Sequence, residues 1–397
     1  MKTKASAFLL ISLLAIFLLT SCSSPTSTPE STPDRAAVQL KITAGHKLLF
    51  ENNIPMSKDK STVIDILKAA NEAFDAKITI SDDGKHMTKT DNFTDTEKDG
   101  FLYTWDFTVN GEKSAQTADI ATVSDGDVIE YRLTWGNGKI DLKEGAKYTA
   151  EPVEWFRFNS VNEKNRIVQG GCFTGNSFII AFLENDEADS RIILAEIGTD
   201  GNIIRTSEPL DLAHANNIAY NVHRGRLIVS HCQQNVRKDE PDRYSTYSFV
   251  DPRTFEITET DELKRPFFSI GYSFERGLFG AGEWAGGTVD VYADYYYSGQ
   301  SILLLRNINV EIPKTLSQGV WCDDTGIWFV RSSQDGYPCE IRIYDWENCK
   351  LKFEIPINNM DIEPESINIY GDEVYIVCNN KEYNGGIVYK LNFNEIE

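Results

Sequence analysis

The sequence predicts a mainly β protein in two parts: a small α+β module, then a larger region built from strands alone. Three observations lead to this prediction. One segment near residue 65 carries apolar residues at helical spacing. Short apolar runs bounded by turn residues fill most of the remaining chain. From residue 153 onward these runs recur in units of similar length, which indicates a repeated architecture.

The first residues indicate export. Two early lysines precede an apolar run over residues 7–19, which is too short for a comfortable membrane span. The run ends in Leu-Thr-Ser-Cys at residues 19–22, which resembles the bacterial lipobox, where the cysteine is lipidated and becomes the mature N-terminus. The resemblance implies a signal peptide over residues 1–21 and a lipid anchor at Cys22. The protein would then sit on the cell membrane and face the extracellular side or the periplasm.

Residues 22–36 follow as a segment rich in Ser, Thr and Pro with no large apolar residue. Such a segment cannot bury a core, so we expect a solvated stalk between the anchor and the folded modules. The whole chain carries 60 acidic and 39 basic residues, a formal net charge of −21. This charge argues against nucleic acid or anionic lipid as a partner.

Six cysteines remain besides Cys22. An exported protein can form disulfides, but Cys172, Cys232, Cys322 and Cys378 sit singly in apolar runs, as buried free thiols do. Both interpretations stay open. No paired Cys or His spacing suggests a metal site, and no motif implies a cofactor.

The first module covers residues 37–135. Two strand-like runs lie at 38–45 and 47–55, and Ser61 is then expected to cap a helix. Further strand-like runs follow at 77–80, 101–111 and 127–135. Two strands, a helix and more strands give a β-grasp order, with the helix packed across one sheet face. The apolar stripe of the expected helix is formed by Val63, Ile66, Leu67, Ala70 and Phe74.

Two motifs in this module carry a family resemblance. Residues 105–111 read Trp-Asp-Phe-Thr-Val-Asn-Gly, and residues 124–131 read Ser-Asp-Gly-Asp-Val-Ile-Glu-Tyr. Together with the expected helix, they resemble the transcobalamin C-terminal-like family, which is also catalogued as a domain of unknown function. In transcobalamin the related domain closes over a corrinoid, so the resemblance implies a cobalamin-binding ancestry. The vitamin-binding helical domain of transcobalamin has no counterpart in this chain.

Residues 136–152 form a polar stretch without periodicity and are expected to be a linker. The region 153–397 then contains five units, which begin at residues 169, 217, 269, 318 and 365, so their spacing is 47 to 52 residues. Each unit offers three or four strand-like runs, which is the pattern of a β-propeller blade. The sequence therefore predicts a five-bladed β-propeller, with a β-sandwich as the alternative. YVTN- and NHL-like extracellular propellers are relatives by analogy of fold alone.

The last unit has three strands. Residues 154–158, Glu-Trp-Phe-Arg-Phe, precede the first unit and could supply the missing strand. This pairing would join the two ends of the region and leave no free sheet edge.

Chain direction places the starts of first strands and the loops between second and third strands on one face. Amides and a carboxylate beside an aromatic loop suit a hydroxylated ligand, since amides both donate and accept hydrogen bonds and aromatic faces stack on apolar ring surfaces. Structural hydrogen bonding within the blades is the alternative. The candidate ligand-binding residues are Gln169, His214, Asn216, Asn217, Trp284, Tyr295, Tyr296, Tyr297, Gln318 and Glu365.

The function expected from these features is a lipid-anchored binding or adhesion protein that recognises an extracellular small molecule, glycan or protein. A glycan, a peptide and a corrinoid are the possible ligands. Two alternatives stay open: a hydrolase or lyase that uses the propeller channel, and a scaffold for protein partners that uses the β-grasp sheet. Catalysis is disfavoured because the axial set offers one strong carboxylate, whereas glycosidases need two. No nucleophile-elbow, zinc-protease or phosphate-loop motif occurs.

Overall fold

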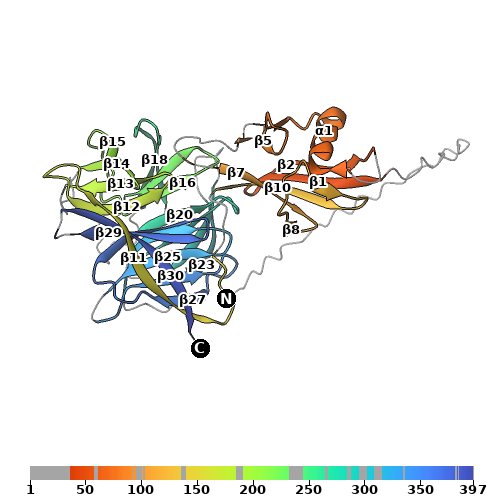
Figure 1. Cartoon of the computed structure of the whole chain (residues 1–397). Coiled ribbons are helices and arrows are strands. Elements are labelled where there is room, and N and C mark those ends of the chain that lie inside the picture. Colours follow the sequence, from red (N-terminus) through yellow and green to blue (C-terminus); the bar gives the residue numbers. More distant parts are fainter. Residues whose placement is uncertain are drawn as a thin grey trace, which may run out of the picture. The chain divides into compact units, whose positions relative to one another are not determined.

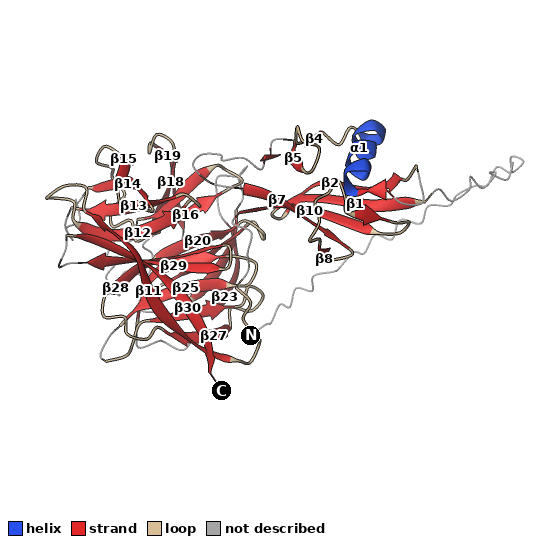
Figure 2. Ribbon diagram, in the orientation of Figure 1, coloured by secondary structure: helices blue, strands red, loops and turns tan. Residues whose placement is uncertain are grey.

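The computed structural model describes residues 36–57, 61–91, 93–94, 101, 103–135, 140–184, 191–231, 245–263, 267–283, 288–294, 302–307, 315–333, 336–380, 382 and 384–396. These residues belong to one compact unit, Ala36–Glu397. The described chain is mainly β and contains a single helix (Figure 2). The expected signal peptide, Cys22 and the expected stalk up to residue 35 lie outside the described residues, as do Trp284 and Tyr295, Tyr296 and Tyr297.

The first module is a five-stranded sheet in the order β2-β1-β10-β7-β8. Strand β1 pairs antiparallel with β2 and parallel with β10. A hairpin followed by a helix, with the first and last long strands parallel in the middle of the sheet, is the order expected for a β-grasp. The strands are β1 (Ala37–Ala44), β2 (Lys47–Pro55), β7 (Tyr103–Val109), β8 (Glu112–Lys113) and β10 (Val128–Trp135).

Helix α1 (Val63–Phe74) begins one residue later than the sequence suggests. Its N-cap is Thr62, whose side chain accepts a hydrogen bond from the Asp65 backbone N–H, while the Asp65 carboxylate accepts one from the Thr62 N–H. Ser61 is therefore not the cap, because this reciprocal pair needs an acid three residues after the capping hydroxyl. Phe74 is 40% exposed, so it does not belong to the predicted stripe. The buried face is formed by Val63, Ile64, Ile66, Leu67 and Ala70.

Five short strands complete this module. Two of them form a small sheet beside the start of the helix, and three form a meander after its end. They are β3 (Ser61–Thr62), β4 (Ile78–Ile80), β5 (Met87–Thr90), β6 (Phe93–Thr94) and β9 (Thr122–Val123).

The rest of the described chain forms five four-stranded antiparallel sheets (Figure 1). Four of them contain consecutive strands. Sheet one contains β12 (Ile167–Phe173), β13 (Ser177–Leu183), β14 (Ile192–Gly198) and β15 (Ile203–Thr206). Sheet two contains β16 (Asn217–Asn221), β17 (Arg226–Ser230), β18 (Ser245–Val250) and β19 (Ile257–Leu263). Sheet three contains β20 (Ser269–Ser273), β21 (Leu278–Gly282), β22 (Val289–Ala293) and β23 (Ile302–Asn307). Sheet four contains β24 (Leu316–Cys322), β25 (Ile327–Ser332), β26 (Glu340–Tyr344) and β27 (Leu351–Pro356).

Sheet five joins the two ends of the repeated region. Its order is β11-β30-β29-β28, with β11 (Lys147–Asn159), β28 (Glu363–Tyr370), β29 (Glu373–Asn380) and β30 (Gly385–Ile396). The segment 154–158 lies in β11 and pairs antiparallel with β30, as the sequence suggested. However, β11 begins at Lys147, inside the range 136–152 that was expected to be a linker.

The strands that begin the five sheets, called first strands below, are β12, β16, β20, β24 and β28. Each first strand contacts the next one along the chain, and β28 contacts β12. Nearly all their residues are buried, because each strand is covered by its own sheet and by the neighbouring first strands. The arrangement is propeller-like.

Candidate functional site

The predicted polar residues lie where the first strands begin, and this end of the sheets is called the first-strand face below. In three sheets the pairing of the first strand with the second shifts by a bulge at the predicted position. The shifts fall between Val168 and Gly171, between Ser317 and Val320, and between Pro364 and Ser366. Gln169, Gln318 and Glu365 therefore occupy equivalent places. A bulge leaves a residue outside the ladder and redirects its side chain.

Glycine follows the glutamine in two of these bulges for a packing reason. A Cβ on Gly170 would lie 2.7 Å from Asn217 Cα, and one on Gly319 would lie 2.6 Å from Ser366 Cα. Both contacts are with the backbone of another first strand, which cannot move aside as a flexible side chain can. The Gln-Gly pairs thus mark the places where two first strands approach most closely.

Asn217 joins three sheets through its side chain. Its Nδ2 donates to the carbonyl oxygens of Ile270 at 3.0 Å and Val320 at 3.1 Å, and its Oδ1 accepts from the Val320 N–H at 3.0 Å. Both donor hydrogens of the amide are used. These bonds account for the burial of Asn217 without a ligand, so this residue ties β16 to β20 and β24.

Two other predicted residues, Gln318 and His214, also have hydrogen-bond partners within the protein. Gln318 Nε2 donates to Glu363 Oε1 at 2.9 Å and to Ser332 Oγ at 3.3 Å. His214 Nδ1 lies 2.6 Å from Asn216 Oδ1. An amide oxygen only accepts, so this contact places the proton on Nδ1. Glu365 is 3% exposed.

Three buried polar atoms on this face have no hydrogen-bond partner: Gln169 Oε1, Ser269 Oγ and Ser317 Oγ. Their residues lie at or near the starts of β12, β20 and β24. Leaving a buried polar group unsatisfied costs about 1–3 kcal/mol, so each of these atoms calls for water or a ligand. The sequence could indicate the polar positions, but it could not show which of them stay unsatisfied.

The structure also contains a pocket at the opposite end of the first strands, which the sequence reasoning missed. It is a largely enclosed cavity of about 50 Å³, called the indole pocket below. Its lining comes from the last residues of β20, β24 and β28, from the turns that follow these strands, and from the end of β10. The residues are Trp135, Tyr272, Phe274, Glu275, Trp321, Cys322, Asp323, Asp324, Ile369 and Gly371.

The two tryptophans define this pocket. Their ring centroids are 5.1 Å apart with the ring planes at 46°. Both indole Nε1 atoms are buried and have no hydrogen-bond partner. Trp321 follows the Gln318 bulge by three residues, so a recurrent spacing pointed to its neighbourhood, but no sequence signal pairs it with Trp135.

A wider cavity of about 840 Å³ adjoins the indole pocket and shares Trp135, Glu275 and Asp324 with it. It is lined by charges of both signs. The remaining lining residues are Lys41, Thr43, Gly45, His46, Leu48, Glu51, Asp106, Lys113, Glu130, Arg132, Leu133, Thr134 and Arg276.

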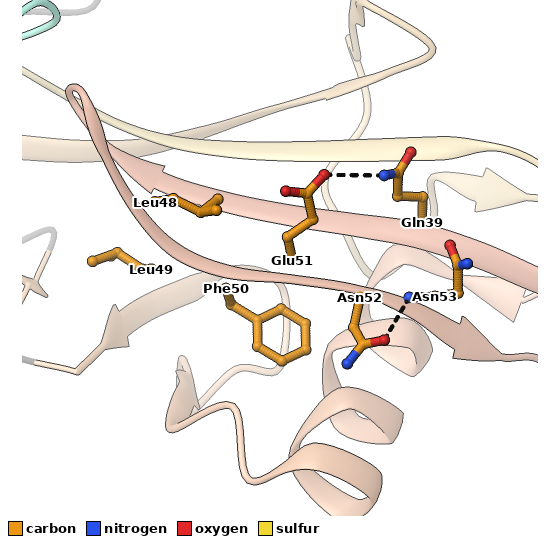
Figure 3. A pocket seen from close by; sticks show the side chains of 7 residues that line it. All are labelled: Gln39, Leu48, Leu49, Phe50, Glu51, Asn52 and Asn53. Atoms are coloured by element: carbon orange, nitrogen blue, oxygen red, sulfur yellow. Dashed lines mark hydrogen bonds between the residues drawn. The ribbon is translucent and has the colours of Figure 1, made fainter. Parts of the chain in front are cut away.

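A third, open hollow of about 580 Å³ runs along β2, at the edge of the first module's sheet (Figure 3). Gln39 Nε2 donates to Glu51 Oε1 at 3.1 Å across β1 and β2, while Phe50 points toward the helix side. Leu48 is 53% exposed. This hollow is a surface along an edge strand and does not enclose a ligand.

The described residues show neither a metal cluster nor a disulfide. No group of three or more His, Cys, Asp or Glu side chains in the described part is suited to a metal ion. No helix in that part has the length and apolarity that a membrane crossing requires. The described cysteines are free and buried, and they are Cys172, Cys322, Cys339, Cys349 and Cys378.

Comparison with known families gives a match in the first module. Residues 60–134, within the first module, match the family described as "Domain of unknown function (DUF4430)". No curated protein matches the sequence.

Solved structures resemble the propeller-like part. Glutaminyl cyclase from Myxococcus xanthus is 10% identical, with 63% of this chain and all of that chain covered at a TM-score of 0.44. A glycosyl hydrolase from Bacteroides ovatus is 12% identical, with 64% and 96% covered at a TM-score of 0.39. The β-propeller domain of Cps50 from Myceliophteria thermophila is 10% identical, with 54% and 67% covered at a TM-score of 0.30.

Proposed function

We propose that this chain is an exported, lipid-anchored protein whose five sheets are the blades of a five-bladed propeller, and that the propeller binds a small polar ligand at the first-strand face. The anchor rests on the lipobox-like ending at Cys22. The five blades rest on the repeated spacing, the five four-stranded sheets and the contacts between successive first strands.

One observation carries the binding proposal: the unpartnered atoms Gln169 Oε1, Ser269 Oγ and Ser317 Oγ. All three are acceptors, and the two hydroxyls also donate, so they suit a ligand that offers hydroxyl or amide groups. A glycan or a peptide meets this requirement. Because Asn217 is saturated by backbone contacts, the ligand-binding role falls to Gln169, Gln318 and Glu365, beside the two serines.

The test compares buried serines whose hydroxyl groups have no hydrogen-bond partner with a buried serine whose hydroxyl group has one. Ser317→Ala and Ser269→Ala remove an unsatisfied hydroxyl, so stability should stay unchanged or rise by about 1 kcal/mol. Binding of a hit from a glycan and peptide screen should weaken. The matched control is Ser230→Ala, whose Oγ bonds Asn217 O at 3.4 Å and has no proposed ligand role.

Equal binding by Ser269→Ala, Ser317→Ala and the parent protein would contradict the proposed site. Gln318→Ala and Glu365→Gln extend the series to the bulges. If a screened compound is turned over and Glu365→Gln abolishes this turnover, the hydrolase alternative replaces the binding protein.

The anchor has its own experiment. Cys22→Ala should abolish acyl labelling and move the protein from the membrane fraction to the medium or periplasm. A Ser23→Ala variant next to it should stay lipidated and membrane-bound. Membrane fractionation and acyl labelling that survive in Cys22→Ala would refute the anchor and leave the binding proposal unaffected.

A further inference from the structure

The indole pocket has an acidic lining, in which three carboxylates face one nearby guanidinium, that of Arg276. Glu275, Asp323 and Asp324 all line it, and none of them forms an ion pair with a described residue. Asp323 Oδ1 is committed to its own turn, where it accepts from the Thr325 and Gly326 N–H groups and from Trp328 Nε1. Glu275 accepts only from the Ser273 hydroxyl, at 3.3 Å.

The cations nearby are engaged elsewhere. Lys41 and Arg132 line the wider cavity, and both bond to Glu130, at 3.4 and 2.9 Å. Arg276 donates to the backbone carbonyl of Asp324 at 3.2 Å, and its guanidinium lies over the Trp346 ring. Among the described residues here, the three carboxylates outnumber the single guanidinium of Arg276, so the lining carries a net negative charge.

Perturbed acidities agree with this arrangement. Removal of its carboxyl group from water raises the pKa of Glu275 to about 7, although the residue as a whole is exposed, and the charges of Asp323 and Asp324 add to the increase. Burial raises the pKa of Asp323 to about 6, and the charge of Asp324 acts in the same direction. Carboxylates with raised pKa values in a concave site gain from an arriving positive charge.

Aromatic rings form the other walls. Trp135, Trp321, Tyr272 and Phe274 all line the pocket. The face of an aromatic ring attracts a cation, most strongly when the cation has lost part of its water, and tryptophan is the best of the aromatic residues for this contact. Carboxylates and aromatic faces together favour an organic cation. An ammonium has no acceptor for the two indole N–H groups, so these donors need water or an acceptor elsewhere on the ligand.

We propose that the indole pocket binds the head of an organic cation, a primary ammonium group, while the rest of that ligand lies in the wider cavity. The sizes fit. A water molecule occupies about 30 Å³ in the liquid, so 50 Å³ admits an ammonium nitrogen with its attached carbon and little more. This site lies at the opposite end of the first strands from the proposed polar site and does not rest on it.

The probe is n-butylammonium, with n-butanol as an uncharged compound of similar size. Because Trp135 and Trp321 line the pocket, tryptophan fluorescence should change saturably with butylammonium and should not respond to butanol in the same way. The full mature chain is used. Glu275→Gln combined with Asp324→Asn should weaken butylammonium binding about tenfold, since both substitutions keep shape and remove charge.

Glu347→Gln is the matched control, because Glu347 is an exposed acid on the turn after β26 and lines neither cavity. It should bind butylammonium as the parent protein does. A Trp321→Phe variant should bind more weakly while keeping an aromatic wall. The proposal fails if butylammonium gives no saturable change, if butanol acts equally, or if the double variant binds with unchanged affinity.

Discussion

At the scale of single residues, similar amides serve different purposes. Asn216 and Asn217 are adjacent and equally buried, yet Asn216 Oδ1 faces His214, whereas Asn217 bonds the backbones of two other sheets. Sequence spacing singles out both positions because polar residues stand out in apolar strands. It cannot tell them apart, since the partners of Asn217 lie 53 and 103 residues away along the chain.

This difference predicts unequal losses of stability. Asn217→Ala removes three buried hydrogen bonds that join the backbones of two other sheets, so the free energy of unfolding should fall by about 3–5 kcal/mol. Asn216→Ala should cost clearly less, since it removes one contact with a half-buried histidine. Urea unfolding of both variants measures the difference. Equal losses would show that Asn217 does not tie the sheets together.

At the scale of elements, the sequence predicted five repeated units and the strand that completes the last one, because apolar runs and turn residues repeat along the chain. It missed the first half of β11. Residues 147–150 alternate between exposed and buried, but their outward residues are polar and Pro152 follows. Proline has no backbone N–H. It is tolerated there because β11 is the edge strand of sheet five, where a strand does not need to donate to a second neighbour.

The two faces of β11 should therefore respond differently to truncation. Phe158 is 4% exposed and packs edge-on against Phe182 with ring centroids 6.0 Å apart. Phe158→Ala should lower the free energy of unfolding by about 3–5 kcal/mol, the cost of a cavity in a packed core. Val153 is 50% exposed on the same strand, and Val153→Ala should change stability little. A small effect at Phe158 in chemical denaturation would argue that β11 contributes little to sheet five.

At the scale of the whole molecule, the indole pocket shows what a sequence cannot reveal. Its walls come from the ends of four strands and from three turns, so residues between 135 and 371 meet only in the folded chain. The acidic pair Asp323-Asp324 reads as a solvated turn in the sequence, and Asp323 does organise that turn. The sequence of this turn does not show that aromatic residues from distant parts of the chain lie beside it and form a cavity with it.

The pH dependence of stability follows from this cavity. The folded-state pKa of Glu275 is raised to about 7, above its ordinary value of 4.5, so the folded protein holds a proton that the unfolded chain releases. The resulting stability is fully present below about pH 4 and is lost as the pH rises toward 7. Glu275→Gln keeps a neutral group at every pH. The variant should therefore unfold at a higher temperature than the parent protein near pH 8 and at a similar temperature near pH 4. Glu347→Gln controls for the loss of one negative charge from an acidic protein. The prediction is wrong if Glu275→Gln shifts the unfolding temperature equally at both pH values, or by no more than Glu347→Gln does. Either result would show that Glu275 is not held in an unfavourable charged state.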